Sequence, residues 1–228
     1  MSQTRLSLLV DHRNPGSLAA RFRRRRFAVF EALVASLPGP LAILDLGGEQ
    51  RFWEVAGFGP LAASGRFQVT LLNLELQPVS LPGFTAVAGN AADLSIYPDR
   101  SFDIVFSNSV IEHLETWENQ QRMACEARRT GRRYFIQTPN RYFPLEPHFL
   151  VPGYQFFPLW LQTILLQRFN LGWYQRIPDR QAAVRHIRTH RLLTAAELRR
   201  LFPGCQIHRE RLFGLTKSLT AISPSEDW

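Results

Sequence analysis

Two pairs of acidic and imidazole side chains stand out in this chain of 228 residues. Glu112 is followed directly by His113, and Glu146 and His148 flank Pro147. An imidazole held near a carboxylate can act as a general acid or base. Proline stiffens the backbone between Glu146 and His148, as a positioned pair requires. We therefore treat His148, Glu146 and His113 as candidate catalytic residues, while an ordinary surface loop stays open as the alternative for the second pair.

A pair of glycines is the next candidate for chemistry. The apolar run Leu41–Leu46 contains Asp45 and leads into Gly47 and Gly48. An apolar run that ends in glycine is typical of a strand buried on both faces. Glycines let the backbone turn sharply and approach a ligand without an intervening Cβ. In a doubly wound sheet this turn lies at the carboxyl ends of the strands, where ligands bind.

The elements that must position these residues can be read from the middle of the chain. Apolar runs of strand length alternate with helices or short connections, which favours a parallel α/β sheet. The predicted strands are Leu41–Leu46, Phe67–Asn73, Phe84–Ala88, Phe102–Ser107 and Arg133–Thr138. The predicted helices of this part cover 17–37, Arg51–Ala56 and, with a break near Thr116, Val110–Arg129.

The C-terminal part of the chain predicts a helix and two short strands. Thr194 and Glu197 have the spacing of a capping box, which favours a helix over Leu193–Phe202. The runs Cys205–Leu212 and Leu219–Ile222 are short enough to form an antiparallel edge of the sheet.

Between these two parts lies a predicted helical and aromatic insert at about 141–190. Tyr154–Phe169 is predicted to be an apolar helix that is too short to span a bilayer, which needs about 20 apolar residues. Residues 175–191 are basic and polar and are predicted to be an exposed connection. The preferred interpretation is that the insert covers the sheet or forms a dimer contact. The alternative is that it forms a lid or an interfacial helix that admits a lipid-linked acceptor.

One segment carries a resemblance to a known family. Asp99–Leu114 reads DRSFDIVFSNSVIEHL and resembles the fourth-strand signature of the class I S-adenosylmethionine-dependent methyltransferases, in which Ser-Phe-Asp enters the strand and Glu-His sits on the following helix. The resemblance is continuous over Leu41–Asn140. It implies a single domain, 1–228, with a doubly wound, mostly parallel seven-stranded sheet of the Rossmann-like methyltransferase type and an antiparallel C-terminal edge. It also implies S-adenosyl-L-methionine as the cofactor.

The resemblance further implies which residues contact the cofactor. The glycine motif would wrap the methionine part, the end of the second strand would hold the ribose, a loop would lie beside the adenine, and the end of the fourth strand would wall the sulfonium. The matching positions, in that order, are Asp45, Gly47 and Gly48; Asn73 and Leu74; Asn90 and Ala91; and Ser107 and Asn108. Asn73 and Asn90 replace the usual acids, although an amide can still bond a hydroxyl or an adenine edge.

A metal site is not expected from the sequence. Some small-RNA 2′-O-methyltransferases of this class have a similar Val-Ile-Glu-His segment, with a second acid before it and a later histidine, and these residues hold a divalent ion. Here Ser109 stands where the first acid would be. Glu112, His113 and His148 alone do not make a convincing ligand set, so local hydrogen bonds are the preferred interpretation.

Net charge and cysteine content limit the binding partners and the cellular compartment that we expect for this protein. The net charge is +8 and comes almost entirely from arginine, since Lys217 is the only lysine. The run Arg21–Arg26 favours a solvated helix face over a polyanion site. Cys125 and Cys205 fit no metal spacing and residues 1–13 lack a signal-peptide pattern, so we expect a cytoplasmic location, with peripheral membrane contact as an option.

These observations predict an S-adenosylmethionine-dependent methyltransferase that acts as a monomer or homodimer. The expected acceptor is an oxygen of a small molecule, a glycan or a lipid-linked compound. An RNA-directed methyltransferase using the basic face is an alternative, but no aromatic stacking platform is interleaved with the arginines. A non-catalytic remnant of the fold is a further alternative, because the glycine motif lacks the family's later glycines.

Overall fold

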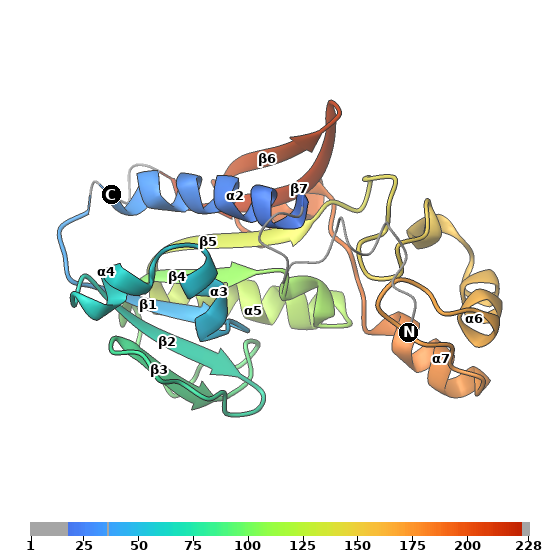
Figure 1. Ribbon diagram of the computed structural model, residues 1–228, viewed down its shortest axis with the longest axis horizontal. Coiled ribbons are helices and arrows are strands. Elements are labelled where there is room, and N and C mark those ends of the chain that lie inside the picture. Colours follow the sequence, from blue (N-terminus) through green and yellow to red (C-terminus); the bar gives the residue numbers. More distant parts are fainter. Residues whose placement is uncertain (1–17, 36, 225–228) are drawn as a thin grey trace.

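The computed structural model describes residues 18–35 and 37–224, and it has a seven-stranded sheet as its centre (Figure 1). The strands lie in the order β3-β2-β1-β4-β5-β7-β6. Their bounds are β1 Leu41–Leu46, β2 Phe67–Asn73, β3 Phe84–Ala88, β4 Phe102–Asn108, β5 Gly131–Pro139, β6 Gln206–Leu212 and β7 Leu215–Ile222. β7 pairs antiparallel with both β5 and β6, while the other pairs are parallel. The predicted doubly wound sheet with an antiparallel edge is therefore confirmed.

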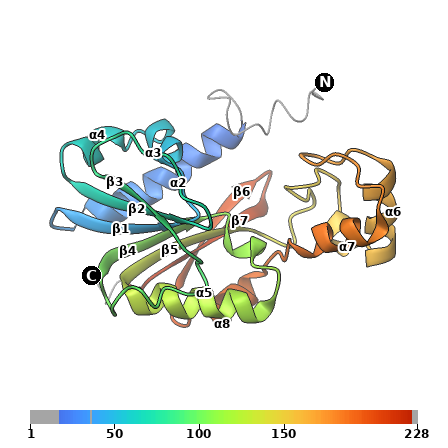
Figure 2. The same cartoon turned by 90° about the horizontal axis from the view of Figure 1, so that it is seen from below.

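The central strand β1 shows why the sheet needs helices on both faces. Leu41 and Ile43 belong to one buried cluster, whereas Leu44 and Leu46 belong to another. Because alternate residues of a strand point to opposite faces, β1 is buried on both. Figure 2 shows the consequence, with α2, α3 and α4 on one side of the sheet and α5 and α8 on the other.

On the first face, aromatic side chains fill the core. The helices there are α2 (Leu18–Ala35), α3 (Gln50–Val55) and α4 (Gly59–Ala63). Phe30 of α2 is fully buried, and its ring lies 5.1 Å from that of Phe106 on β4 and 5.4 Å from that of Phe135 on β5. Edge-to-face rings at such distances add to the stabilisation from burial. The helix predicted at 17–37 is described over Leu18–Ala35, and positions 17 and 36 lie outside the described residues.

On the second face, short and capped helices pack through aliphatic side chains. The 3₁₀ turn η1 (Ile111–His113) leads to α5 (Trp117–Thr130), whose N-cap Thr116 accepts a hydrogen bond from the backbone of Asn119. The predicted break near Thr116 is thus the start of the helix. α8 (Ala195–Leu201) has the predicted capping box between Thr194 and Glu197.

The insert packs beyond the carboxyl ends of β4 and β5 (Figure 1). It contains η2 (Tyr154–Phe156), α6 (Leu159–Arg168) and α7 (Arg180–Arg188), which share a small buried cluster of their own. Its two ends lie side by side, since Asn140 and Leu193 form a parallel bridge. The chain therefore leaves the sheet and returns to it at nearly the same point.

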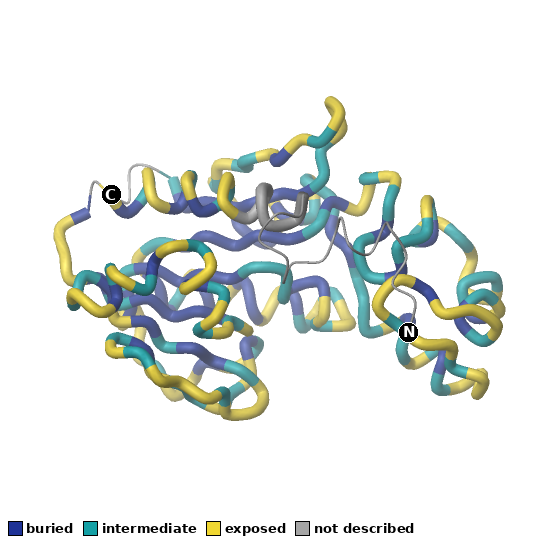
Figure 3. The backbone as a smooth tube through the Cα atoms, viewed as in Figure 1, coloured by how far each residue is buried: buried dark blue, intermediate teal, exposed yellow. Residues whose placement is uncertain are grey.

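Two local predictions in the insert differ from the structure. Residues 175–191 contain the helix α7 rather than an exposed connection only, because Asp179 caps it and Ala183 and Ile187 are buried one turn apart. The predicted helix Tyr154–Phe169 is divided, since Pro158 precedes α6 and no helix can run through it from η2. The burial pattern follows this division, with exposed and buried positions alternating over short distances in the insert (Figure 3).

Within residues 18–35 and 37–224, no helix is both long and apolar enough to cross a membrane. This agrees with the prediction for Tyr154–Phe169.

The packing of α2 on the sheet can be tested with one substitution. We expect Phe30→Ala to lower the free energy of unfolding by about 3–5 kcal/mol, because it opens a cavity between α2 and the sheet. Chemical denaturation measures this change. As a control, Phe213→Ala removes a ring that is 93% exposed and should change stability by less than about 0.5 kcal/mol. Equal effects of the two substitutions would contradict the packing of α2.

Candidate active site

The turn after β1 requires glycine at two positions for different reasons. Gly47 has a φ of +75°, a region that residues with a Cβ rarely adopt, and a Cβ there would lie 2.5 Å from Cγ2 of Val110. A Cβ on Gly48 would lie 1.7 Å from Oδ2 of Asp45. The backbone of Gly48 therefore rests directly on the Asp45 carboxyl group, as only glycine permits.

Asp45 is held beneath this turn by an indole. Its side chain is buried, and Oδ2 accepts a hydrogen bond of 2.7 Å from Nε1 of Trp53 on α3. Burial raises the pKa of Asp45 to about 7, since it disfavours the charged form, and the bond from Trp53 opposes this only in part.

Asn73 supports the turn from β2. Its Nδ2 donates a hydrogen bond of 2.8 Å to the backbone oxygen of Gly48. An ionised carboxylate cannot donate, so the amide makes a contact that the acid implied by the resemblance would not. The other amide atom, Oδ1, is an acceptor of the kind that a ribose hydroxyl can bond.

The end of β4 faces the turn from the next strand. Ser107 is fully buried and donates its hydroxyl proton to the backbone oxygen of Leu46, at 3.2 Å. Asn108 accepts a hydrogen bond of 2.5 Å from Nη1 of Arg26 on α2, and Nε of Arg26 lies 3.4 Å from a carboxylate oxygen of Glu210 on β6. One arginine thus fixes Asn108 relative to both α2 and the edge strand.

A cavity of about 590 Å³ opens between these strand ends. It is lined by Asp45, Gly47, Gly48, Glu49, Arg51, Phe52, Val55, Asn108, Ser109 and His113. This volume is within the range of about 300–1,000 Å³ that is usual for small-molecule sites. The close approach of backbone at Gly48 fits a nucleoside with an amino-acid tail.

Five predicted cofactor residues do not line this cavity, namely Asn73, which bonds the turn from β2, and four others. Leu74 is 80% exposed, Ala91 is buried in the core, and the side chain of Asn90 accepts a hydrogen bond from the backbone of Ala92 at 2.9 Å. The hydroxyl of Ser107 donates its proton to the backbone oxygen of Leu46 and is not available to a ligand as a donor. These residues shape the strand ends and the neighbouring turn rather than the wall of the cavity.

His148 and Glu146 form the positioned pair that the sequence suggests. Nδ1 of His148 lies 2.8 Å from Oε1 of Glu146. Oε2 of the buried Glu146 accepts hydrogen bonds from the backbones of His148 and Phe149, at 2.7 and 2.6 Å. A carboxylate can only accept from the ring, so Nδ1 carries the proton and Nε2 is left to face away from Glu146.

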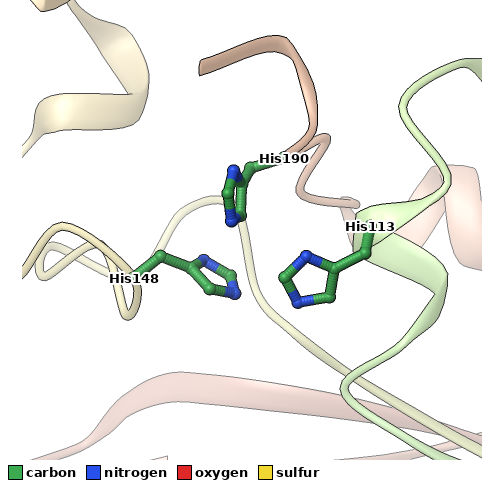
Figure 4. A group of neighbouring side chains, drawn as sticks. All are labelled: His113, His148 and His190. Carbon is green, nitrogen blue, oxygen red and sulfur yellow. The ribbon is translucent and has the colours of Figure 1, made fainter. Parts of the chain in front are cut away.

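His113 and His190 complete a cluster of three imidazoles with His148 (Figure 4). The ring centroids are 4.8 Å apart for His113 and His148, 4.9 Å for His113 and His190, and 4.4 Å for His148 and His190. The three side chains come from η1, from the loop after β5 and from the segment after α7. Figure 4 shows the rings converging on one point.

The surroundings shift the pKa values of these groups in opposite directions. Burial lowers the pKa of His113 to about 4 and that of His190 to about 3, and the charge of His148 acts in the same sense. For His148, burial acts to lower the pKa, but the bond and charge of Glu146 and the charge of Glu112 together raise it. Burial raises the pKa of Glu112 to about 7, although the charge of His148 and the hydroxyl of Thr138 oppose the shift.

A second cavity, of about 290 Å³, lies on the insert side of the cluster. It is lined by Arg141, Glu146, Phe149, Tyr154, Gln155, Gln162, Ile187, His190, Arg191 and Leu192. His113 lines the first cavity and His190 the second, and their rings are in contact. Two neighbouring imidazoles of the cluster therefore line two different cavities.

Comparison with known proteins identifies the family. Residues 61–133 match a family model described as a methyltransferase domain. A solved structure of an S-adenosylmethionine-dependent methyltransferase from Methanosarcina mazei is similar in fold, with a TM-score of 0.52 at 14% identity, over 84% of this chain and 95% of that one. The chain thus contains a match to a methyltransferase domain and has the class I S-adenosylmethionine-dependent methyltransferase fold. The predicted resemblance is confirmed by this match and by the fold, and S-adenosylmethionine is the methyl donor of the family that the model describes.

Two further comparisons report proteins that are similar to this chain. The 1,6-didemethyltoxoflavin-N1-methyltransferase of Burkholderia thailandensis, solved with 1,6-didemethyltoxoflavin and S-adenosylhomocysteine, has a TM-score of 0.50 at 15% identity, over 95% of this chain and 83% of that one. An uncharacterised protein of Mycobacterium tuberculosis is 36% identical over 56 residues, which are 25% of this chain and 19% of the relative. The match thus spans about a fifth of that curated relative.

Two contributors to the candidate site were not predicted from the sequence. His190 lies in the stretch predicted to be an exposed connection, and only the cap Asp179 with the spacing of Ala183 and Ile187 signals the helix that positions it. Trp53 pairs with Asp45 across eight residues, a spacing that carries no periodic signal.

The close contact at Gly48 gives a test of the cofactor cavity. We expect Gly48→Ala to displace the Asp45 carboxyl and to weaken S-adenosylhomocysteine binding by about tenfold or more, measured by calorimetry. The matched control is Gly59→Ala, where the nearest atom to a new Cβ is 3.8 Å away. Unchanged affinity in a folded Gly48→Ala variant would show that the ligand does not bind against this turn.

The buried Asp45 gives a test by pH. Its pKa in the folded chain is about 7 and in the unfolded chain about 3.9, so ionisation costs stability as the pH rises between these values. Asp45→Asn removes that cost and keeps an acceptor for Trp53. Its unfolding free energy relative to wild type should therefore rise between about pH 4 and pH 8, by at most about 4 kcal/mol. Parallel stability curves for the two proteins would contradict the buried, raised-pKa carboxyl.

Proposed function

We propose that this protein transfers the methyl group of S-adenosylmethionine to an oxygen of a small or lipid-linked acceptor. The observation that carries the proposal is that two neighbouring imidazoles line two different cavities, since His113 lines the cavity beside Gly48, His190 lines the second, and their ring centroids are 4.9 Å apart. A methyltransferase needs such an arrangement, since donor and acceptor must meet in line and away from water.

The cofactor side of the proposal rests on the strand ends. Gly47 and Gly48 leave room for close backbone approach, Asn73 offers Oδ1 to a hydroxyl, and Asn108 is held at the cavity wall by Arg26. Bound S-adenosylmethionine supplies an electrophilic methyl group on a sulfonium that leaves as a neutral thioether.

The acceptor side rests on His148. Glu146 fixes the ring through Nδ1, so Nε2 is the nitrogen that can take a proton from an acceptor hydroxyl. The His148 side chain is 13% exposed and lies against His113. A proton acceptor that is ordered, shielded and adjacent to the cofactor cavity favours methylation of oxygen, for which deprotonation is required.

The surface of the insert favours an acceptor with a hydrophobic portion. Large apolar side chains are exposed there rather than buried in the small core of the insert: Tyr142, Phe156, Leu159, Trp160, Ile164, Phe169 and Trp173. Arg168 ends α6 and Arg176 and Arg180 follow it in the chain. Apolar side chains next to arginines are typical of contact with an anionic lipid surface, so we favour a lipid-linked acceptor.

Transfer of a tritiated methyl group tests this proposal. The full chain is incubated with methyl-labelled S-adenosylmethionine and the lipid, small-molecule and RNA fractions of the source cells. We expect label in the lipid or small-molecule fraction. His148→Ala should reduce transfer by about 10²- to 10⁴-fold, the usual contribution of a general base, without weakening S-adenosylhomocysteine binding.

The outcomes separate the alternatives. Label confined to RNA would replace this proposal with an RNA-directed methyltransferase, and binding to RNA would then depend strongly on salt. Absence of S-adenosylhomocysteine binding at millimolar ligand would identify a non-catalytic remnant of the fold. Full transfer by His148→Ala would remove His148 from the reaction.

A further inference from the structure

We propose that His113, His148 and His190 bind one divalent transition-metal cation, with Zn²⁺ as the first candidate. One ligand atom from each of these residues lies within 4.8 Å of the other two. The side chains come from three separate elements and converge on one point (Figure 4). The sequence offers only part of this set, because His190 joins it through the fold.

The hydrogen bonds behind the rings prepare two of them as metal ligands. Nδ1 of His148 donates to Glu146, which leaves the lone pair of Nε2 for the cluster. A carboxylate behind a metal-bound imidazole is the usual way in which proteins fix the tautomer and raise the basicity of the ligand.

His190 has the same tautomer for a different reason. The Thr189 hydroxyl donates its one proton to the backbone oxygen of His186, at 2.7 Å, so it can only accept from Nδ1 of His190, 3.0 Å away. Nδ1 therefore carries the proton, and the lone pair is on Nε2. This nitrogen lies 2.7 Å from the hydroxyl oxygen of Tyr174. A cation would take the place of that hydroxyl on Nε2.

The backbone holds the histidines in place before any ion binds. The backbone N–H of Arg191 donates to the backbone oxygen of Glu112, at 2.7 Å, so the residue after His190 is tied to the residue before His113. The Arg191 guanidinium also bonds Gln120 and Glu197, at 2.7 and 2.6 Å. These contacts join the end of the insert to α5 and α8 and limit the reorganisation that binding would need.

The buried carboxylate of Glu112 supplies a negative charge that favours a bound cation. Glu112 is fully buried, and Oε2 accepts from Thr138 at 3.0 Å. Its other oxygen, Oε1, has no hydrogen-bond partner among the residues that the structure describes. The charge of Glu112 acts on His148, so a cation held by His148 would stabilise a carboxylate oxygen that has no donor of its own.

The ligand set selects the class of metal. Three imidazole nitrogens suit Zn²⁺ and its neighbours, whereas Mg²⁺ and Ca²⁺ prefer oxygen. Zn–N bonds of about 2.0–2.1 Å would draw the nitrogens together by small side-chain rotations. Three protein ligands leave a coordination position open, as in catalytic rather than structural zinc sites.

The acceptor hydroxyl can bind at the open coordination position, and this role of the cation rests on the proposed function. The acceptor hydroxyl loses its proton to solvent, its oxygen lone pair forms the bond to the methyl carbon, and the carbon–sulfur bond breaks with its electron pair kept by sulfur. A cation stabilises the negative charge on the acceptor oxygen and so lowers the pKa of the hydroxyl. When the cation is bound, Nε2 of His148 coordinates it and no longer takes the proton of the acceptor hydroxyl. The cation then activates the acceptor in place of His148.

Metal binding can be measured without any acceptor. The full chain, free of affinity tags and stripped with a chelator, is titrated with Zn²⁺ by calorimetry and with Co²⁺ by visible absorption, and metal content is determined after dialysis. We expect one equivalent per chain. His113→Ala and His190→Ala should each weaken binding, and Glu146→Gln should do so by about 10- to 100-fold through loss of the bond to His148.

The control variant is His208→Ala, which removes a histidine on β6 outside the cluster and should leave zinc binding unchanged. Circular dichroism and thermal unfolding of each variant show whether it is folded. If folded His113→Ala and His190→Ala bind zinc as wild type does, or if wild type binds none, the metal site is overturned. Calorimetry with S-adenosylhomocysteine in the same samples separates the two proposals, since loss of that binding with zinc binding intact would overturn the methyl transfer alone.

Discussion

The contact between Asp45 and Gly48 is the constraint on which the site depends. A buried carboxyl group at the end of a strand must find a donor, and Trp53 supplies it from the following helix. The space that Asp45 then occupies leaves no room for a Cβ at Gly48. The turn, α3 and the cavity wall are thereby fixed by one arrangement of three residues.

Polar groups at neighbouring strand ends extend this arrangement across the molecule. Asn73 bonds the turn from β2, and Arg26 connects Asn108 of β4 with Glu210 of β6. Burial lowers the pKa of Arg26, and the charges of Glu210 and Glu112 oppose that shift. An arginine in the run that the sequence predicts to be solvated is therefore part of the interior, because α2 crosses the sheet where these acids lie.

Much of the fold follows from the sequence, and less of the site. Continuous apolar runs predict β1 and β2 at their observed bounds, since burial on both faces leaves little choice of residue. The family resemblance predicts Asp45, Gly47 and Gly48 from the glycine motif and Asn108 from the end of the fourth strand, and these four residues line one cavity. His190 could not be assigned in this way, because its place beside His113 depends on the return of the insert to the sheet.

The central claim is that the cavity beside Gly48 holds the methyl donor with its reactive end toward the imidazole cluster. A crystal structure of the protein with S-adenosylhomocysteine tests it most directly. The account predicts density for the ligand in the cavity, with a ribose hydroxyl on Asn73 and the sulfur on the side of Asn108 and His113. Ligand bound elsewhere, or with its sulfur turned away from His113, would contradict it.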